Sequence, residues 1–411
     1  MSRLGLFAGY GVELEYMLVS DPGLDVLPAV DGLLEAEAGE PCADLERGAT
    51  AWSNELVLHV LEMKTNGPAP GLAGLAALVL ADVARAGVLA ADLGGRLLPG
   101  GAHPWMDPAT ETRLWPHEDG PIYRAYDRIF GCRGHGWSNL QSTHLNLPFA
   151  DDAEFGRLHA AIRLLLPALP ALFASSPLLD GRPTGFLDSR MEVYAHNSDR
   201  VPSVSGLVIP EPVFDEATYR RDIFERMYRD IAPLDPEGIL RHEFLNARGA
   251  IARFDRGAIE IRVLDIQECP AADLGLAALA CAALQALAGE RWSSLAAQQA
   301  FTAESLAAIL RACVRDADQA VLDDPRYLAA FGLERERRLS AAEFWSHLLA
   351  AVLPPEARDP AWKIAYDAYS SGGSLARRIL AALAGDFRRE RLREVYAGLA
   401  DCLDRGEVFG A

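Results

Sequence analysis

Near its N-terminus the chain reads Gly11-Val12-Glu13-Leu14-Glu15-Tyr16, in which acidic and apolar side chains alternate. Side chains two positions apart on a β-strand point to the same face of the sheet. Glu13 and Glu15 would therefore lie side by side, with the apolar side chains on the opposite face. Two adjacent carboxylates repel each other unless a cation lies between them. This stretch predicts a strand with one face for the core and one face for a cation.

Three later segments show the same alternation, and each places charged or metal-binding side chains on one face. A sheet that gathered these faces would form a pocket of oxygen ligands and one imidazole, which suits Mg²⁺ or Mn²⁺ better than zinc. Arginines on the same face would hold phosphate or carboxylate groups. The polar faces are Glu62 and Lys64 in residues 61–64, Ser142, His144 and Asn146 in residues 142–147, and Glu260 and Arg262 in residues 258–263.

The alternation alone leaves two interpretations open. A single Glu-x-Glu strand is usually the solvated face of an antiparallel sheet and not a metal site. Four such strands increase the weight of the metal pocket, but the sequence does not show that the four strands are neighbours. From spacing alone, a metal pocket and a set of solvated faces are equally good hypotheses.

Helical spacing fills the chain between and after these strands, over residues 71–92, 152–175 and 216–231 and over most of 273–399. Strands that are far apart in sequence, separated by helices and charged on one face, predict an α+β fold whose sheet has one open, functional face. We expect one domain over residues 1–411, with a mostly helical C-terminal part from about residue 273.

The composition excludes several classes of function. The 411 residues include 58 Asp and Glu against 39 Lys and Arg, a net charge of −19. This excess disfavours a protein that binds nucleic acid or an anionic membrane surface. A hydrophobic fraction of 50% with 24% charged residues is typical of a folded globular protein and not of a disordered one.

The sequence also indicates a compartment. No signal peptide is visible, and the six cysteines are scattered without a C-x-x-C pair, which favours buried thiols and a reducing cytoplasm. The apolar stretches 164–179 and 274–287 are interrupted by Pro, or by Gly and Gln, before they reach the roughly 20 residues that a bilayer needs. We expect a cytoplasmic protein without a membrane span, and we favour a homodimer because dimers are common among enzymes.

Familiar nucleotide and hydrolase motifs are missing. The sequence has no G-x-x-x-x-G-K-[ST] phosphate loop, no H-E-x-x-H, no G-x-S-x-G and no strand-linked G-x-G-x-x-G. If the protein uses a nucleotide, it must bind it through metal ions and arginines on a sheet.

Several spaced motifs between about residues 8 and 380 carry a family resemblance. The sequence resembles the glutamate-cysteine ligases, and most closely their short bacterial carboxylate-amine ligase branch. The motifs, in chain order, are Gly11-Val12-Glu13-Leu14-Glu15, Leu61-Glu62 followed by Thr65, Gly101-Ala102-His103-Pro104-Trp105, His144-Leu145-Asn146, Ala174-Ser175-Ser176-Pro177 with Ser189-Arg190, Asn246-Ala247-Arg248, Glu260-Ile261-Arg262-Val263-Leu264-Asp265 and Ser371-Gly372-Gly373-Ser374-Leu375.

The resemblance implies a fold and a reaction. The fold is a curved antiparallel sheet backed by helices, as in glutamine synthetase and the guanidino kinases. The activity is an ATP- and Mg²⁺-dependent ligation, with Mn²⁺ as a possible substitute, in which the γ-carboxylate of glutamate becomes an acyl phosphate and is then joined to an amine such as cysteine. The partners are thus a small carboxylic acid and a small amine.

The same resemblance assigns roles to residues. It implies Glu13, Glu15, Glu62, His144 and Glu260 as metal ligands. Arg190 and Arg262 would stabilise the transferring phosphoryl group, since guanidinium groups supply this kind of electrostatic catalysis. The substrate-binding candidates are Arg248 for a carboxylate, Glu55 and Asp265 for orienting the amine or accepting its proton, and His103 in the Gly/Pro loop.

Two other classes of function stay open. A metal-dependent hydrolase could use the same carboxylates and histidine to activate water, and it would turn over without ATP. A non-catalytic protein on a degenerate ligase scaffold could bind a cation or a small molecule, an option that Leu58 supports because the short branch often has an acidic residue there.

Overall fold

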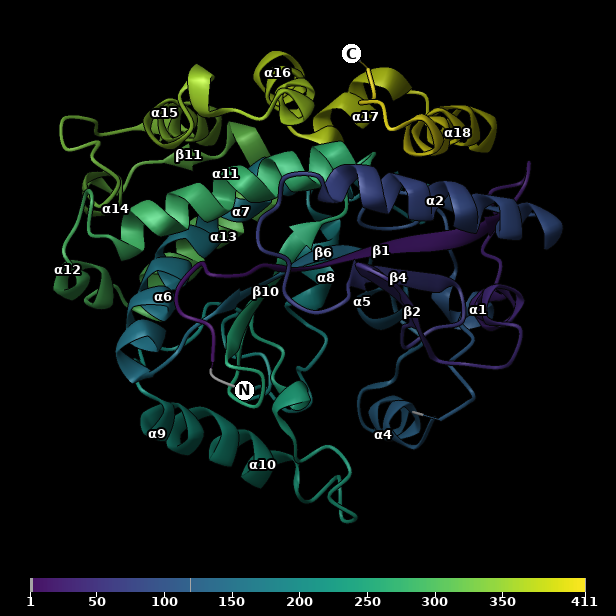
Figure 1. Cartoon of the computed structure of the whole chain (residues 1–411), viewed down its shortest axis with the longest axis horizontal. Helices are drawn as coiled ribbons and strands as arrows, with labels where there is room; N and C mark the ends of the chain where they lie inside the picture. The colour runs from purple at the N-terminus through teal and green to yellow at the C-terminus, as the bar shows by residue number, and fades with distance from the viewer. Residues whose placement is uncertain (1–2, 119, 411) are drawn as a thin grey trace.

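An antiparallel sheet runs through the middle of the molecule (Figure 1). The computed structural model describes residues 3–118 and 120–410, and within them the sheet has eight strands in the order β2-β3-β4-β1-β6-β10-β9, with β5 paired to β1. The strands are β1 (Gly11–Ser20), β2 (Asp44–Arg47), β3 (Thr50–Asn54), β4 (Val60–Thr65), β5 (Gly95–Leu98), β6 (Ser142–Pro148), β9 (Ala250–Arg253) and β10 (Ala258–Asp265).

The four strands predicted from their alternation are direct neighbours. The sheet places them in the order β4-β1-β6-β10, so that Glu13 lies opposite both Lys64 and His144, and Glu260 lies opposite Asn146. This order confirms the predicted antiparallel fold and brings the polar faces together. The short strands β2, β3, β5 and β9 were not predicted, because four or five residues without a clear alternation carry little strand signal.

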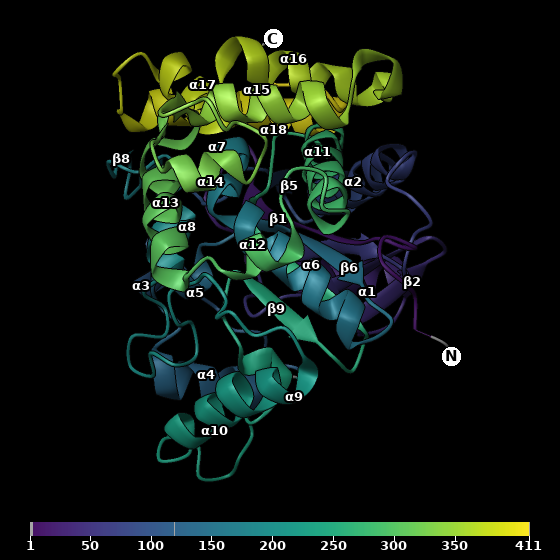
Figure 2. The same cartoon turned by 90° about the vertical axis from the view of Figure 1, so that its left-hand side faces the viewer.

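Helices cover the sheet in layers. Figure 1 and Figure 2 both show the C-terminal helices as an outer layer above α11 and α2, and α4, α9 and α10 on the far side of the sheet. The inner helices are α2 (Leu75–Asp92), α6 (Asp152–Leu165), α7 (Leu169–Phe173) and α11 (Pro270–Ala288). The C-terminal helices are α15 (Ala341–Val352), α16 (Lys363–Gly372), α17 (Leu375–Leu383) and α18 (Arg389–Arg405). The helices below are α4 (Gly120–Phe130), α5 (His135–Ser138), α8 (Ser189–Tyr194), α9 (Glu216–Tyr219) and α10 (Glu225–Ile231).

The remaining elements are the helix α13 and shorter segments. They are α1 (Val30–Ala38), α3 (Pro108–Glu111), α12 (Leu295–Gln299), α13 (Ala303–Asp316) and α14 (Pro325–Ala329), the short helical turns η1 (Leu166–Ala168), η2 (Arg220–Phe224), η3 (Glu243–Leu245), η4 (Ala317–Gln319), η5 (Pro355–Ala357) and η6 (Pro360–Trp362), and the ribbons β7 (Leu178–Leu179) with β8 (Arg182–Pro183) and β11 (Val321–Leu322) with β12 (Leu339–Ser340).

The apolar face of the sheet forms the main core. Val12, Leu14, Leu145 and Ile261 are each at most 2% exposed, and they belong to one buried cluster with side chains of α2, α6 and α11. The same alternation leaves Glu13 and His144 on the opposite face. The core therefore holds the strands in the register that gathers the acidic side chains.

Helix α11 corrects one expectation from the sequence. Its 19 residues are long and apolar enough to cross a membrane, with a mean hydropathy of 1.7 despite the interruptions at Gly275 and Gln285. However, 78% of this segment is buried inside the protein, as in a core helix. A Cβ atom at Gly275 would lie 3.2 Å from Cβ of Trp362, so the glycine lets α11 approach η6 closely.

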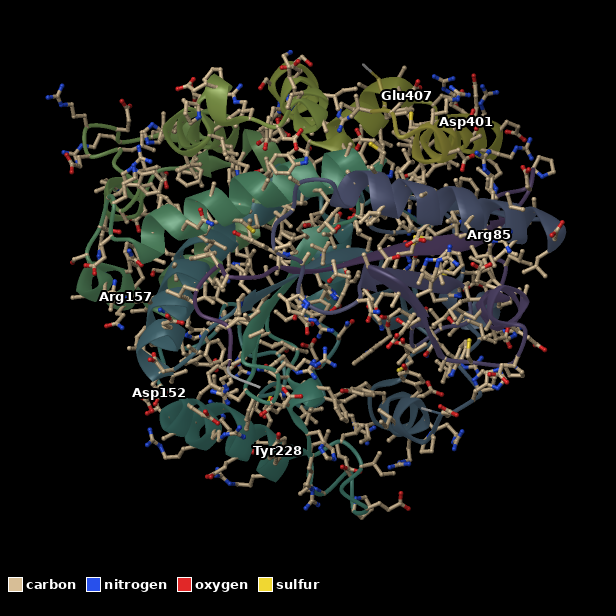
Figure 3. The ribbon with its side chains drawn as sticks, in the orientation of Figure 1. Arg85, Asp152, Arg157, Tyr228, Asp401 and Glu407 are labelled. Carbon is tan, nitrogen blue, oxygen red and sulfur yellow. The ribbon has the colours of Figure 1, made fainter. Side chains whose placement is uncertain are left out.

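Charged side chains lie at the periphery. Figure 3 shows Arg85, Arg157 and Asp401 at the edges of the molecule, where their ion-pair partners are Glu37, Glu290 and Arg96. Exposed pairs of this kind contribute about 0–1 kcal/mol each. All six cysteines are unpaired and four of them are buried, as the sequence predicted. The stability of the fold thus depends on its apolar core.

We expect Leu145→Ala, in the central strand β6, to lower the free energy of unfolding by about 2–5 kcal/mol, because a fully buried side chain would leave a cavity. Denaturant unfolding followed by circular dichroism measures this. The control is Leu78→Ala on α2, where Leu78 is 44% exposed and the change should stay within about 0.5 kcal/mol. Equal effects of the two variants would contradict the assignment of the core.

Candidate active site

A cavity of about 1350 Å³ lies over the polar face of the sheet. The central strands supply its acidic floor, and α4, α5, α8 and η3 supply much of the remaining wall. The structure brings eight of the predicted site residues to this one cavity. They are Glu13, Glu15, Glu55, Glu62, His144, Arg190, Glu260 and Arg262.

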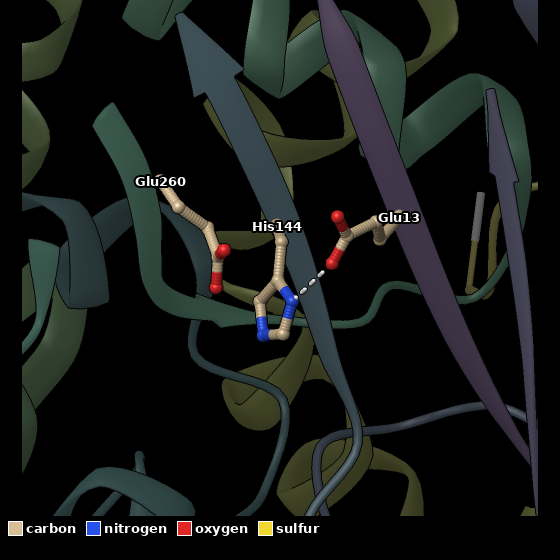
Figure 4. Close-up of side chains that lie close together, drawn as sticks. All are labelled: Glu13, His144 and Glu260. Carbon is tan, nitrogen blue, oxygen red and sulfur yellow. Dashed lines mark hydrogen bonds and ion pairs between the residues drawn. The ribbon is translucent and has the colours of Figure 1, made fainter. Parts of the chain in front are cut away.

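The first cluster of metal-binding groups comes from three adjacent strands (Figure 4). Glu13, His144 and Glu260 each offer one ligand atom, and these atoms lie within 4.8 Å of one another. His144 Nδ1 is 2.8 Å from Oε2 of Glu13, and Asn146 Nδ2 donates to the other oxygen of Glu13 at 3.0 Å. The pairing of β1 with β6 and of β6 with β10 fixes this arrangement.

A second cluster shares the same histidine. Glu15, Glu62 and His144 also offer three ligand atoms within 4.8 Å of one another. The backbone N–H and the hydroxyl of Ser142 both donate to Oε2 of Glu15, at 2.7 and 2.9 Å. The Ser53 hydroxyl donates to Oε1 of Glu62 at 2.7 Å. Each carboxylate thus keeps at least one oxygen in a fixed direction, as metal ligands in proteins usually do.

Crowding of the carboxylates shifts their protonation. Burial alone would raise the pKa of Glu13, but the hydrogen bond and charge of His144 lower it to about 2. Burial, together with the charge of Glu13, raises the pKa of Glu62 to about 7. Burial and the charges of Glu15 and Glu62 raise the pKa of Glu55 well above its usual range. Protons and His144 therefore reduce the mutual repulsion of these groups near neutral pH.

The donor set fits a divalent cation. Hard carboxylate oxygens with a single imidazole nitrogen suit Mg²⁺ or Mn²⁺, and neutral His144 has one lone pair to give to an ion in one cluster or the other. Lys64 Nζ lies 3.2 Å from Oε1 of Glu62 and 2.7 Å from Oδ2 of Asp44, so the Lys64 ammonium group forms ion pairs with both carboxylates. The identity of the residues as metal ligands stays a prediction.

Two arginines stand beside the acidic clusters. Nε of Arg262 is 2.8 Å from Oε1 of Glu260. Arg190 is 2% exposed, and its Nη2 donates to the backbone oxygen of Arg262 at 3.1 Å. Both guanidinium groups line the cavity. Their charge can therefore act on an anion that is bound there.

Asp265 does not line the cavity, although the sequence assigned it to the substrate. The register of β10 against β6 shifts between Ile261 and Leu264, so the strict alternation of faces ends before Asp265. The Asp265 carboxylate is fully buried, and it accepts from Nε of Arg190 at 2.5 Å and from the hydroxyl of Ser176 at 2.7 Å. It positions Arg190 and has no access to a ligand.

Arg248 and His103 also lie outside the cavity, unlike their assignment from the sequence. Arg248 is 1% exposed and donates to both carboxylate oxygens of Glu211, at 2.5 and 2.7 Å. The buried His103 ring places Nε2 2.7 Å from the backbone oxygen of Leu24. Both side chains are therefore engaged in contacts that hold loops in place. A sequence motif does not distinguish this role from ligand binding.

The C-terminal glycine motif is another structural feature. Gly373 adopts a positive φ of 76°, and the N–H of Ser374 donates to Oδ1 of Asp318 at 3.2 Å. The segment joins α16 to α17 in the outer helical layer and does not line the cavity.

Sequence reasoning missed the aromatic part of the cavity wall. Tyr126, Trp137, Tyr194 and Phe244 all line the cavity, from α4, α5, α8 and η3. Only Tyr126 lies in residues 100–135, a segment rich in Gly, Pro, His and Trp of the kind that often carries function. The other three residues lie outside it, and no pattern in the sequence marks them.

The architecture identifies the fold, which this chain shares with a solved ligase structure. The structure is similar to glutamate-cysteine ligase from Francisella tularensis in complex with AMP, with a TM-score of 0.63 and 13% identity, and it covers 98% of this chain and 90% of that one. The sequence gives the family. The model of glutamate-cysteine ligase family 2 matches residues 10–398, so the chain belongs to this family and is a carbon-nitrogen ligase, as the motifs had indicated.

Two relatives are similar over most of the chain. An uncharacterized protein of Archaeoglobus fulgidus is 29% identical over 402 residues, which cover 97% of this chain and 99% of the relative. A glutamate-cysteine ligase of Halobacterium salinarum is 26% identical over 265 residues, 64% of this chain and 65% of that protein.

Glu62→Gln should stabilise the metal-free protein at pH 8. The pKa of Glu62 in the folded protein is raised from 4.5 to about 7. Ionised Glu62 therefore destabilises the folded protein, and this destabilisation grows as the pH rises from about 4.5 to about 7 and reaches its full value at higher pH. We expect a gain on the order of 2 kcal/mol at pH 8 that vanishes near pH 4.5. Calorimetry in EDTA at both pH values measures this, with the exposed Glu46→Gln as control. A less stable E62Q protein at pH 8 would contradict the repulsion.

Asp265→Asn should lower the free energy of unfolding by about 3–5 kcal/mol, because it removes the negative charge that is paired with the buried guanidinium of Arg190. In the double variant with Arg190→Met the two losses should not add, which a denaturant double-mutant cycle will measure. If D265N instead keeps wild-type stability and changes only the KM of a substrate, Asp265 contacts that substrate.

Proposed function

We propose that the protein is an ATP- and Mg²⁺-dependent ligase that activates the γ-carboxylate of glutamate, or of a similar acid, and joins it to an amine. The observation that carries the proposal is the pair of carboxylate-histidine clusters that line one cavity together with Arg190 and Arg262. A carboxylate and a polyphosphate can meet only where cations neutralise both, and this cavity concentrates the groups that supply or hold such cations.

The two clusters of metal-binding groups would bind separate ions. Glu13, His144 and Glu260 would hold one ion, and the carboxylates of Glu15 and Glu62 would hold a second. Bound Mg²⁺ would supply charge neutralisation for the phosphates and the acid. AMP in the similar ligase from Francisella tularensis supports an adenine nucleotide as the other substrate, and relatives named glutamate-cysteine ligase support glutamate.

The remaining side chains act on the reacting groups. Arg262 and Arg190 would stabilise the phosphoryl group as it passes from ATP to the acid, because fixed guanidinium groups lower the energy of developing charge. In the second step the amine attacks the acyl phosphate and phosphate leaves. Glu55 lines the same cavity, and once bound cations have offset the neighbouring charges its carboxylate could accept the proton of the attacking amine.

The first test is release of ADP in the presence of Mg²⁺, glutamate and hydroxylamine, a small nucleophile that traps acyl phosphates whatever the natural amine is. We expect ADP and a hydroxamate in equal amounts, and no ADP without the acid or the metal. Glu13→Gln and Glu260→Gln should each reduce the rate by a factor on the order of 10².

The controls separate the competing functions. Glu46→Gln, an exposed change on β2, should keep the wild-type rate. If the protein shows metal-dependent hydrolysis that needs no ATP, then it is a hydrolase and not a ligase. If the protein binds Mg²⁺, E13Q abolishes this binding, and no acid supports turnover of ATP, then the protein is a non-catalytic binding protein and not a ligase.

A further inference from the structure

Lysine is nearly absent from this chain, and one of its lysines lines the cavity. The sequence has two lysines, Lys64 and Lys363, against 37 arginines. Lys363 is exposed on α16 and pairs with Asp367, whereas Lys64 belongs to β4 and lines the cavity. An ammonium group is a compact point charge with three donors, whereas a guanidinium group is a planar fork. Lys64 therefore gives the cavity a kind of cation that its arginines do not supply.

Three oxygen atoms surround the Lys64 ammonium group. Nζ donates to Oγ of Ser53 at 2.7 Å, and it lies 2.7 Å from Oδ2 of Asp44 and 3.2 Å from Oε1 of Glu62. The register of β2, β3 and β4 gathers these oxygens, because Ser53 lies opposite both Asp44 and Glu62. Three acceptors use all three donors of an ammonium group. Lys64 has no donor left for a substrate, so it acts on the site through its charge.

The arginines of the cavity are attached to other strands. Each belongs to the β9–β10 hairpin or is bonded to it, and β1 and β6 separate that hairpin from β4. These arginines are Arg3, Arg190, Arg253, Arg256 and Arg262. Among the residues that the structure describes, Lys64 is the only Lys or Arg in an ion pair with Glu62. The charge of Lys64 is therefore the local counter-charge of the second cluster.

Glu62 joins Lys64 to the second cluster. Oε1 of Glu62 accepts from the Ser53 hydroxyl at 2.7 Å and faces Lys64, which leaves Oε2 for an ion. A divalent cation on Oε2 would share one carboxylate with the ammonium group, and the two positive charges repel each other. Solvent screens this repulsion only in part, because the side chains of Glu62 and Lys64 are 9% and 25% exposed. Without Lys64, Ser53 would still hold Oε1, so the loss would be one of charge.

We infer that Lys64 is a positioning residue that acts as a fixed cation of the site. It balances the charge of Glu62 while the second cluster is empty, and it lowers the affinity of that cluster for a divalent ion. The inference rests on the proposed function, in which Glu15 and Glu62 bind an ion. Lys64 therefore stabilises the empty site at the expense of ion binding, and replacing it with an apolar side chain should reverse both effects.

The test is a Mn²⁺ titration of the metal-free full chain without nucleotide, in which electron paramagnetic resonance measures the free ion. Lys64→Met keeps a long side chain and removes its charge, and we expect it to lower the Kd of one Mn²⁺ ion by at least about tenfold. Lys64→Arg keeps the charge and should stay within about threefold of the wild type. In EDTA, K64M should unfold at a lower temperature than the wild type, and Mn²⁺ should raise its Tm by more.

Two controls assign the effect to Lys64 and to the second cluster. Lys363→Met, at the other lysine of the chain, should leave Mn²⁺ binding unchanged. In the Glu62→Gln background, which lacks one carboxylate of the second cluster, K64M should change the Kd by about threefold or less.

The outcomes distinguish the inference from the ligase. If hydroxylamine and glutamate give ADP release but K64M binds Mn²⁺ no more tightly than the wild type, the inference is overturned and the ligase stands. Equal tightening in K64M and K64R would also overturn the inference, because the effect would then not come from charge. If K64M binds Mn²⁺ more tightly but no acid supports ADP release, the role of Lys64 stands and the ligase is lost.

Discussion

Electrostatic repulsion among carboxylates on one sheet face is the constraint around which the site is built. Glu13, Glu15, Glu62 and Glu260 come from three strands of one sheet and point into the same cavity, and Glu55 follows directly after a fourth. The protein meets this repulsion in three ways. His144 shares its charge with Glu13, Arg262 lies against Glu260, and a raised pKa keeps Glu62 partly protonated near neutral pH.

The fold supplies the free energy that holds these groups together. The opposite face of the same strands is apolar and buried beneath α11, α6 and α2, so the residues that repel one another alternate with residues that stabilise the sheet. Each strand serves both purposes because its side chains change face at every position. A site with this much repulsion favours cation binding at the expense of the stability of the metal-free protein, a common compromise in enzymes.

The side chains of the cavity come from two kinds of element. Glu13, Glu62, His144 and Glu260 lie on the sheet, where the pairing of the strands fixes their positions. The rings of Tyr126, Trp137 and Phe244 lie on α4, α5 and η3, which sit outside the sheet and carry no site residue recognised from the sequence. Loops and short helices tolerate change more readily than paired strands.

The sequence by itself determined the strands with an acidic face, the helical C-terminal part and the family, because an alternation of period two and short motifs are local properties of the chain. It could not determine that β4, β1, β6 and β10 are neighbours, since strand order depends on contacts between residues such as Glu13 and Glu260 that are far apart in sequence. The tertiary structure alone decided that Asp265, Arg248 and His103 are internal partners, and that rings from three separate segments face the cavity. A motif specifies which side chain is present, whereas only packing specifies what that side chain can reach.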